Sequence, residues 1–415
     1  MKDAIMDVTL KYVVLLILIL GTILVIVSEN RNPVKTIAWC MVLIFLPVLG
    51  LTLYILFGMD NRHRRQIKDE DLSRLKGITE ITQNDDILSE MPVPQKPLAD
   101  MLRKMNKSFL LSGNDVEIIT DFQTMSDRLI ADIEGARHHI NMLFFKFEDD
   151  AAGRRIADAL IRKSEEGVQV RLIYDDAGNL MVPRRFYRKL RKHGIQVRGF
   201  IRIFLPILSR DYNSRNHRKV VVIDGRVGYM GGMNIAQRYA EGLKWGIWRD
   251  THMRITGPAV SELQTSFLTD WKFTKGDEPD LGSMYPCNPP SGNTLMQIVT
   301  GGPMDKWNVM MQAYMTAIAS ARHHAYLQSP YFIPPEPIMK VLQNAALSGV
   351  DVRVMIPGIP DKKYVYHTTM SYMDELLEHN VKVLLYPGFI HSKTITVDDE
   401  LLTVGTTNID IRSFI

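Results

Sequence analysis

The chain has 415 residues, a formal net charge of +4 and two cysteines. This length is enough for more than one domain with a sizeable hydrophobic core. The mild positive charge is not typical of a dedicated nucleic-acid-binding protein. Cys40 and Cys287 lie far apart in the sequence, which indicates neither a disulfide framework nor a zinc site and fits a reducing compartment.

Two uncharged apolar runs lie near the N-terminus, at residues 12–28 and 36–58. Each is about long enough to cross a hydrocarbon core of ~30 Å. A cleaved signal peptide is the alternative for the first run, and a buried core helix is the alternative for the second. A second run follows the first and no small-residue cleavage site is apparent, so we expect two transmembrane helices within residues 1–60.

A cluster of basic residues follows the second run, and it consists of Arg62, Arg64, Arg65 and Lys68. The positive-inside rule places this cluster, and the chain that follows it, in the cytoplasm. The same cluster is expected to attract anionic lipid headgroups. The predicted arrangement is a multi-pass membrane anchor that carries a cytoplasmic domain.

Residues 61–108 are polar and include the segment PVPQKP, which predicts a linker with a short helix near 98–106. Alternating strand and helix patterns then predict an α/β domain that is built twice. The segment ARHH occurs at 136–139 and again at 321–324, where we expect helix ends stabilised by basic residues rather than metal ligands. The predicted halves are residues 109–280 and 281–415.

The segment RNHRKVVVIDG places His217 and Lys219 immediately before an apolar run. Residues two apart in a strand face the same side, and Asp224 followed by Gly225 predicts a hairpin turn. The second half contains a matching segment, and every matching pair is 174 residues apart. The pairs are His217 with His391, Lys219 with Lys393, Asp224 with Asp398, Gly231 with Gly405, and Asn234 with Asn408.

Paired histidine and lysine residues suit phosphodiester transfer. One imidazole attacks phosphorus and the other protonates the leaving alkoxide, because histidine titrates near neutral pH. Lys219 and Lys393 would neutralise the phosphoryl oxygens. Neither a metal ion nor another cofactor is expected, because the sequence shows no cluster of carboxylates. Further substrate contacts are expected from Asn234 and Asn408, with the small residues Gly231 and Thr406 beside them.

The paired segments resemble the HKD motifs of the phospholipase D superfamily. The segments GGMNI, WRDTHMRITGPAV, QSPYF and NIDIRSF are similar to those of bacterial cardiolipin synthases. The resemblance implies two α/β halves packed face to face, with the motifs paired at their interface, behind an N-terminal transmembrane hairpin. It also implies location in the bacterial inner membrane and the joining of two phosphatidylglycerol molecules into cardiolipin and glycerol.

The resemblance includes Asp224 and Asp398 in the catalytic motif, although their place at the turn favours a structural role. Members of the superfamily carry an acid roughly thirty residues after each histidine, which orients the imidazole. Asp250 is expected to do this for His217, whereas the same count from His391 passes the last residue, Ile415. We therefore expect a truncated second half, with His217 as the nucleophile and His391 as the general acid.

Several alternatives stay open at this point. If the enzyme were a hydrolase, water would replace the second phosphatidylglycerol. If it used another acceptor lipid, phosphatidylethanolamine would replace it. The apolar runs and the lack of a basic, aromatic groove argue against a nuclease, and two complete motifs argue against an inactive scaffold. The segment 200–210 fits a lipid contact or a core strand equally well, and Tyr331 and Phe332 fit a substrate pocket or core packing. The sequence does not indicate an oligomeric state.

Overall fold

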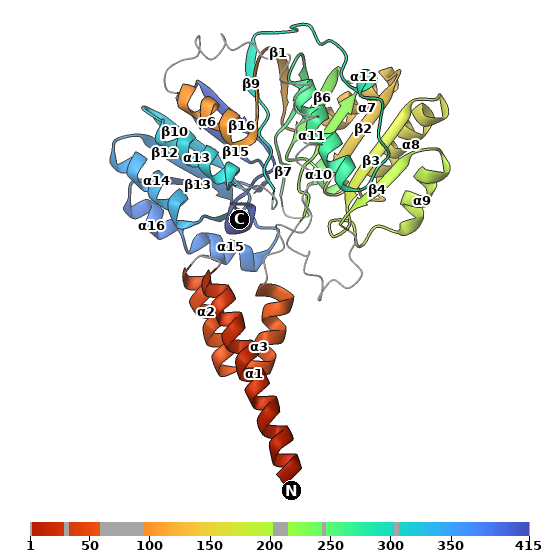
Figure 1. Ribbon diagram of the computed structural model, residues 1–415. Helices are drawn as coiled ribbons and strands as arrows, with labels where there is room; N and C mark the ends of the chain where they lie inside the picture. Colours follow the sequence, from red (N-terminus) through yellow and green to blue (C-terminus); the bar gives the residue numbers. More distant parts are fainter. Residues whose placement is uncertain are drawn as a thin grey trace. The chain divides into compact units, whose positions relative to one another are not determined.

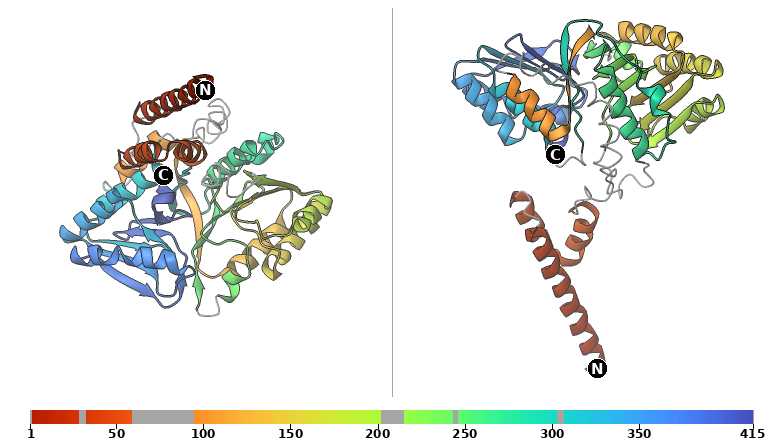
Figure 2. Two further views of the ribbon diagram at one scale, coloured as in Figure 1. Left: turned by 90° about the horizontal axis from the view of Figure 1, so that it is seen from below. Right: turned by 45° about the horizontal axis from the view of Figure 1, so that its top comes forward.

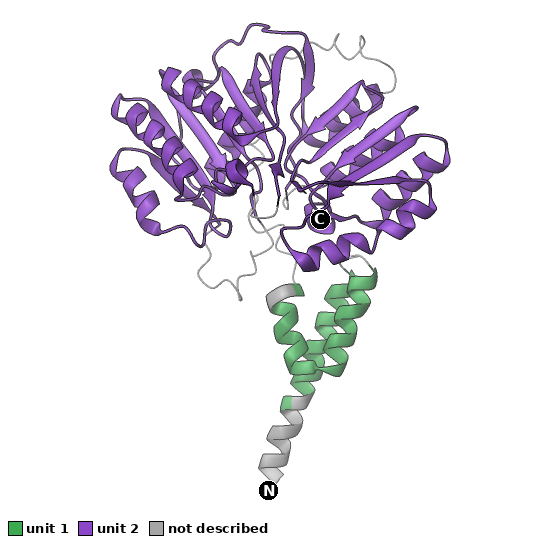
Figure 3. Ribbon diagram, turned by 180° about the vertical axis from the view of Figure 1, so that it is seen from behind, with its two compact units in different colours: residues 1–66, 203–213 green, residues 67–202, 214–415 purple. Residues whose placement is uncertain are grey.

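The structure is a computed structural model that describes residues 2–28, 33–58, 95–201, 215–242, 246–302 and 307–414. The chain forms two compact units, one of residues 1–66 with 203–213 and one of residues 67–202 with 214–415 (Figure 3). The basic cluster at 62–68, most of the predicted linker, and segment 202–214 lie outside the described residues.

The first unit is helical, and its elements are α1 (Lys2–Ser28), α2 (Pro33–Phe45), α3 (Pro47–Leu53) and the π-helix η1 (Tyr54–Gly58). Its small core contains Ile19, Ile26, Leu43 and Tyr54. A side chain at Gly50 would meet the backbone oxygen of Val42 at 2.6 Å. Glycine at this position therefore allows α3 to pack closely against α2.

The second apolar run does not form the continuous helix that its composition predicts. Leu46 leaves the helical conformation, with φ −130° and ψ 68°, and Pro47 starts a new helix. The steric effect of a proline on the preceding residue explains this break. Among the described residues, no helix meets the combined requirement of length and apolarity for a membrane span. The two transmembrane helices expected within residues 1–60 stay a prediction.

The second unit contains both α/β halves. The first half has an eight-stranded sheet in the order β4-β3-β2-β5-β6-β8-β1-β9 (Figure 1). Its strands are β1 (Leu110–Ile119), β2 (His139–Phe144), β3 (Gln169–Asp175), β4 (Gln196–Phe200), β5 (Val220–Ile223), β6 (Val227–Gly231), β8 (His252–Thr256) and β9 (Thr294–Gln297). Strand β9 follows the predicted boundary at 280 yet pairs with β1 in this first sheet.

The second half has a five-stranded sheet in the order β13-β12-β10-β15-β16. Its strands are β10 (His324–Gln328), β12 (Asp351–Pro357), β13 (Lys382–Tyr386), β15 (Thr394–Val397) and β16 (Leu401–Val404). This order repeats β4-β3-β2-β5-β6 of the first half, with three parallel strands followed by two antiparallel ones. The predicted duplication of an α/β half is therefore confirmed.

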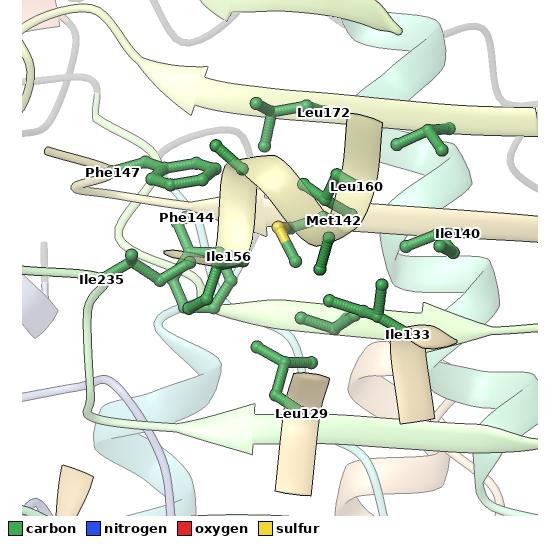
Figure 4. Packing of buried hydrophobic residues seen from close by; sticks show 14 of the residues in the cluster. Leu129, Ile133, Ile140, Met142, Phe144, Phe147, Ile156, Leu160, Leu172 and Ile235 are labelled. Carbon is green, nitrogen blue, oxygen red and sulfur yellow. The ribbon is translucent and has the colours of Figure 1, made fainter. Parts of the chain in front are cut away.

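Helices cover the sheets, and those of the first half are α7 (Phe122–Gly135), α8 (Ala151–Glu165), α9 (Arg184–Lys192), α10 (Arg238–Glu241), α11 (Val260–Phe273) and α12 (Leu281–Met284). Alternate residues of β2 and β5 face opposite sides. Met142 and Val221 join the core under α7 and α8 (Figure 4), whereas Leu143 and Val220 face α11 and the strands beside it. A sheet buried on both faces explains why VVVI is a continuous apolar run.

The helices of the second half are α13 (Val309–Ala319), α14 (Glu336–Leu347), α15 (Lys363–Met370), α16 (Met373–Glu378) and α17 (Ile411–Phe414). A single core joins α13, α14 and α16 to β10, β12 and β15. The helix α6 (Lys96–Asn106), expected in the linker, packs its Leu98 and Leu102 near α13. Figure 2 shows the two halves as separate α/β layers, yellow-green and blue.

Two short strand pairs and one isolated bridge lie outside the two main sheets. Strand β7 (Trp248–Arg249) pairs in parallel with β14 (Phe389–Ile390), and so joins the two halves directly. Strand β11 (Phe332–Ile333) pairs with β17 (Ile409–Asp410) within the second half. The bridge between Phe147 and Ile235 is its counterpart in the first half.

The motif aspartates bind the backbone of the repeated ARHH segments. Asp224 accepts hydrogen bonds of 2.7–2.8 Å from the backbone N–H groups of residues 137–139. Asp398 accepts equivalent bonds from residues 322–324. Both aspartates adopt a positive φ, 52° and 50°. The ARHH segments therefore act through their backbone amides, which corrects the expectation that their basic side chains stabilise helix ends.

These bonds lead to a prediction about stability. Burial disfavours ionisation of Asp224, but the three backbone donors outweigh it and hold its pKa below the ordinary value. The same balance lowers the pKa of Asp398. We expect Asp224→Asn and Asp398→Asn each to lower the free energy of unfolding by about 1–3 kcal/mol, because a charged acceptor is lost while asparagine tolerates the positive φ.

Denaturant unfolding at pH 7 measures this loss, with Asp158→Asn at an exposed position of α8 as the control. A carboxylate with a lowered folded-state pKa stabilises the fold above its unfolded-state pKa, and this stabilisation fades as the pH falls through the folded-state pKa. The difference between variant and wild type should therefore shrink below about pH 4. Equal stability of the variants and wild type at pH 7 would contradict the proposed role.

Candidate active site

The two HxK segments lie just before β5 and β15, at the interface of the halves. The structure starts these strands at Val220 and Thr394, one residue after each lysine. Lys219 and Lys393 are 0% and 2% exposed. Each lysine donates a hydrogen bond from Nζ to the backbone oxygen of its own histidine, His217 or His391. The two motifs therefore share one local geometry, as the duplication predicts.

Contacts between the halves hold both histidines. The Nδ1 atom of His217 lies 2.9 Å from the backbone oxygen of Thr406 in the second half. The Nδ1 atom of His391 lies 2.5 Å from Oδ2 of Asp250 in the first half. Carbonyl and carboxylate oxygens accept these bonds, so each Nδ1 donates and each neutral ring keeps a lone pair on Nε2. Both imidazoles thus present the same atom for chemistry.

The position of Asp250 corrects one expectation. The sequence count assigned this acid to His217, but it binds His391 of the opposite half. The pairing of β7 with β14 is the reason, because it places residues 249 and 390 side by side and lets the His391 backbone N–H donate to the Arg249 oxygen at 2.6 Å. Asp250 therefore does not mark His217 as the nucleophile.

The Asp250 side chain is buried and tightly packed. Its Oδ1 accepts a bond of 2.8 Å from the backbone N–H of Thr251. A side chain at Gly232 would meet Oδ1 at 2.0 Å, so only glycine leaves room for the carboxylate. Burial disfavours its ionisation, but Lys393 and His391 outweigh this and lower the pKa of Asp250. It is therefore an anion that faces the His391 ring.

Aromatic rings surround the two imidazoles. The ring of His391 lies 5.3–5.9 Å, between centroids, from Trp248, Tyr239 and Phe389. The ring of Phe145 lies 4.8 Å from that of His217, and Nζ of Lys219 lies 5.3 Å from the centre of the Phe145 ring. These residues and Gly232 were not predicted as site residues, although WRD and GGMN mark two of their segments.

Burial governs the protonation of the site. Burial and the charges of Lys219 and Lys393 lower the pKa of His217 well below its ordinary value. Burial and Lys393 lower the pKa of His391 to about 4, although Asp250 opposes this shift. Burial lowers the pKa of Lys393 to about 8, and burial and Lys393 lower that of Lys219. Both imidazoles are therefore neutral at pH 7, and a bound anion would favour protonation of one of them.

The four residues predicted to contact the substrate make different contacts in the structure. Asn234 accepts a bond from the backbone N–H of Lys146 and donates one to the Tyr239 hydroxyl, which fixes the segment behind the site. Asn408 donates to Asp410 at 3.2 Å. Thr406 contributes its backbone oxygen to His217. Gly231 lies against His252, where a side chain would meet the His252 Cα at 2.5 Å.

Asp224 and Asp398 do not join the histidines and lysines. They follow β5 and β15, at the strand ends opposite to the motif histidines. Their side chains accept hydrogen bonds from backbone amides of the ARHH segments. Their inclusion among the catalytic residues is therefore corrected to a structural role. Among the described residues, no group of three histidine, cysteine or carboxylate side chains is arranged to hold a metal ion.

Comparison with known proteins agrees with this geometry. A family model described as "Cardiolipin synthase, PLD-like domain" matches residues 129–271 and 314–415. A model described as "Phospholipase_D-nuclease N-terminal" matches residues 14–58. A solved structure of a phosphatidylserine synthase from Haemophilus influenzae covers 77% of this chain and 84% of its own, with a TM-score of 0.56 and 15% identity. That likeness supports the fold alone.

Curated relatives are much closer in sequence. The major cardiolipin synthase ClsA of Bacillus subtilis is 40% identical over 412 residues, which are 95% of this chain and 85% of that protein. A cardiolipin synthase of Listeria monocytogenes is 39% identical over 421 residues, which are 98% of this chain and 87% of that protein. With two matching motifs and these relatives, the chain belongs to the cardiolipin synthase family of phospholipase D-like phosphatidyltransferases.

Proposed function

We propose that this protein transfers a phosphatidyl group from one phosphatidylglycerol molecule to another, which yields cardiolipin and glycerol. The observation that carries the proposal is the pair of histidine–lysine motifs, with both lysines buried, held together across the two halves. Membership in the cardiolipin synthase family supports the choice of substrates. The reaction exchanges one phosphodiester for another, so it needs neither an oxidant nor a nucleotide.

The proposed first step is attack by Nε2 of one imidazole on the phosphorus atom. The bond from phosphorus to the glycerol oxygen breaks, and the other imidazole gives its proton to that oxygen. In the second step a hydroxyl of the second phosphatidylglycerol loses a proton to this imidazole and attacks phosphorus. The phosphorus–nitrogen bond then breaks and frees the first imidazole.

Lys219 and Lys393 are suited to stabilise charge in both steps. They are buried cations, and their attraction to a phosphoryl oxygen is stronger there than it would be in water. A bound phosphodiester would also raise the lowered pKa of both lysines and of the imidazole that acts as the acid. The mechanism uses the same atom, Nε2, of both histidines and so does not distinguish the nucleophile from the acid. Trapping of the phosphorylated residue would identify the nucleophile. Substrate contacts of Asn234, Asn408, Gly231 and Thr406 stay part of the proposal.

We also propose that the helical unit attaches the protein to the bacterial inner membrane, with the catalytic unit on the cytoplasmic side. Large apolar side chains of α1 are exposed, including Leu16, Leu20 and Leu24, at 52–70%. These three leucines are four residues apart and lie on one face of the helix. Membrane attachment would keep the site near its phospholipid substrates.

The first test concerns the product. Expression of the full chain in bacteria that lack cardiolipin should restore cardiolipin, as measured by lipid mass spectrometry. His217→Ala and His391→Ala should each abolish the product, because each removes a reacting group. Phosphatidic acid without cardiolipin would instead indicate a hydrolase, and restored cardiolipin in either variant would contradict the two-histidine mechanism.

The second test concerns Asp250. Asp250→Asn should lower the rate of cardiolipin formation by about 10³-fold, because the His391 ring loses the carboxylate that orients it and stabilises its cation. Asp250 raises the pKa of His391, so its removal should shift the acidic limb of the pH–rate profile to lower pH. Asp158→Asn is the control. An unchanged rate and profile in Asp250→Asn would refute the assigned role.

The third test concerns membrane attachment. We expect the full chain to remain in the membrane fraction after alkaline washing. The triple variant Leu16→Lys, Leu20→Lys, Leu24→Lys should be released, because charged side chains are costly in the bilayer. Leu347→Lys, at an exposed leucine of the catalytic unit, is the control. Retention of the triple variant in washed membranes would show that α1 is not the anchor.

A further inference from the structure

Lys146 lies outside the HKD motif and directly follows Phe145, whose ring centre lies 5.3 Å from Nζ of Lys219. Its backbone N–H donates to Oδ1 of Asn234 at 3.0 Å, and its backbone oxygen accepts from the N–H of Ile235 at 3.2 Å. These two bonds fix its backbone to the GGMNI segment. Its positive charge is one of those that lower the pKa of Lys219, after burial and Lys393. Lys146 therefore adds a third lysine charge, besides Lys219 and Lys393, to the electrostatic field of the site.

Cations from both halves gather around Lys146. Its Nζ lies 3.7 Å from Oε1 of Glu148, which also pairs with Arg238. Burial, then Arg238, and also Lys362 of the second half, lower the pKa of Lys146, while Glu148 opposes them. Glu148 is the carboxylate that contacts both Lys146 and Arg238. Asp361, which precedes Lys362 in the chain, accepts a bond of 2.7 Å from the Tyr331 hydroxyl.

This cation group breaks the symmetry of the duplicated site. The repeats align Lys146 with Tyr331, because Phe147 pairs with Ile235 as Phe332 pairs with Ile409. The first half therefore carries an ammonium group where the second carries a phenol, with Nζ of Lys362 lying 5.7 Å from the centre of that phenol ring. The HKD residues match between the halves, so an asymmetry beside them can distinguish the two lipids.

The second substrate supplies a ligand for such a group. If the proposed function holds, the acceptor phosphatidylglycerol keeps its own phosphodiester throughout the reaction. One glycerol joins the two phosphates of the product, so this second anion must lie close to the first. We propose that Lys146, Arg238 and Lys362 bind the phosphodiester of the acceptor lipid and so select an anionic acceptor over a neutral alcohol or water.

Competition between two acceptors tests this proposal on the full chain. Vesicles of phosphatidylglycerol with labelled glycerol give two products from one intermediate, cardiolipin and labelled phosphatidylglycerol. Only the first product needs a second phosphate site. Lys146→Met and Lys362→Met should lower the ratio of cardiolipin to labelled phosphatidylglycerol about tenfold, because each removes a charged partner of the phosphate. Lys146→Arg keeps the charge and should restore most of the ratio.

Lys189→Met is the control, because that exposed lysine on α9 pairs with Asp158 away from the motifs. Thermal unfolding of each variant shows whether the fold is intact. An equal loss of both products in a folded variant, or an unchanged ratio, would overturn the acceptor site. Failure of the wild type to form cardiolipin while it incorporates labelled glycerol would instead reject the proposed function, so the two failures are distinguishable.

Discussion

The arrangement of the site depends on one hydrogen bond between the halves, from His391 to Asp250. The pairing of β7 with β14 brings the acid to the histidine, and the bond of His217 to the Thr406 oxygen repeats the exchange in the other direction. Neither half alone holds its own imidazole through these contacts. The orientation of the reacting nitrogen atoms is thus a property of the interface between the halves rather than of either sheet.

Much of the fold was predictable because the sequence repeats. The ARHH and HxK segments recur with their strands, and the strand order of the second sheet repeats that of the first. The predictions were wrong where a proline or a strand pairing outweighed the local sequence pattern. Apolar composition predicted one helix over 36–58, but α2 ends at Phe45, two residues before Pro47. Strand β9 crossed the predicted boundary to pair with β1.

The site was only partly predictable, for a related reason. Alternation along a strand places His217 and Lys219 together without knowledge of the tertiary structure, and the constant spacing of the motifs identifies their counterparts. The partner of Asp250 depends on which segments meet between halves, and counting residues within one half cannot supply this. The role of Asp224 was likewise set by distant backbone amides of residues 137–139.

Duplication suits the proposed mechanism, since it needs two imidazoles at one phosphorus atom, one as the nucleophile and one as the acid and then the base. Two identical halves, however, could not distinguish a donor lipid from an acceptor lipid. The two halves are most alike at the HxK segments and differ at Lys146 and Tyr331. The shared chemistry therefore constrains the residues that match between the two halves. Residues that differ between the halves are the ones that can distinguish the two substrates.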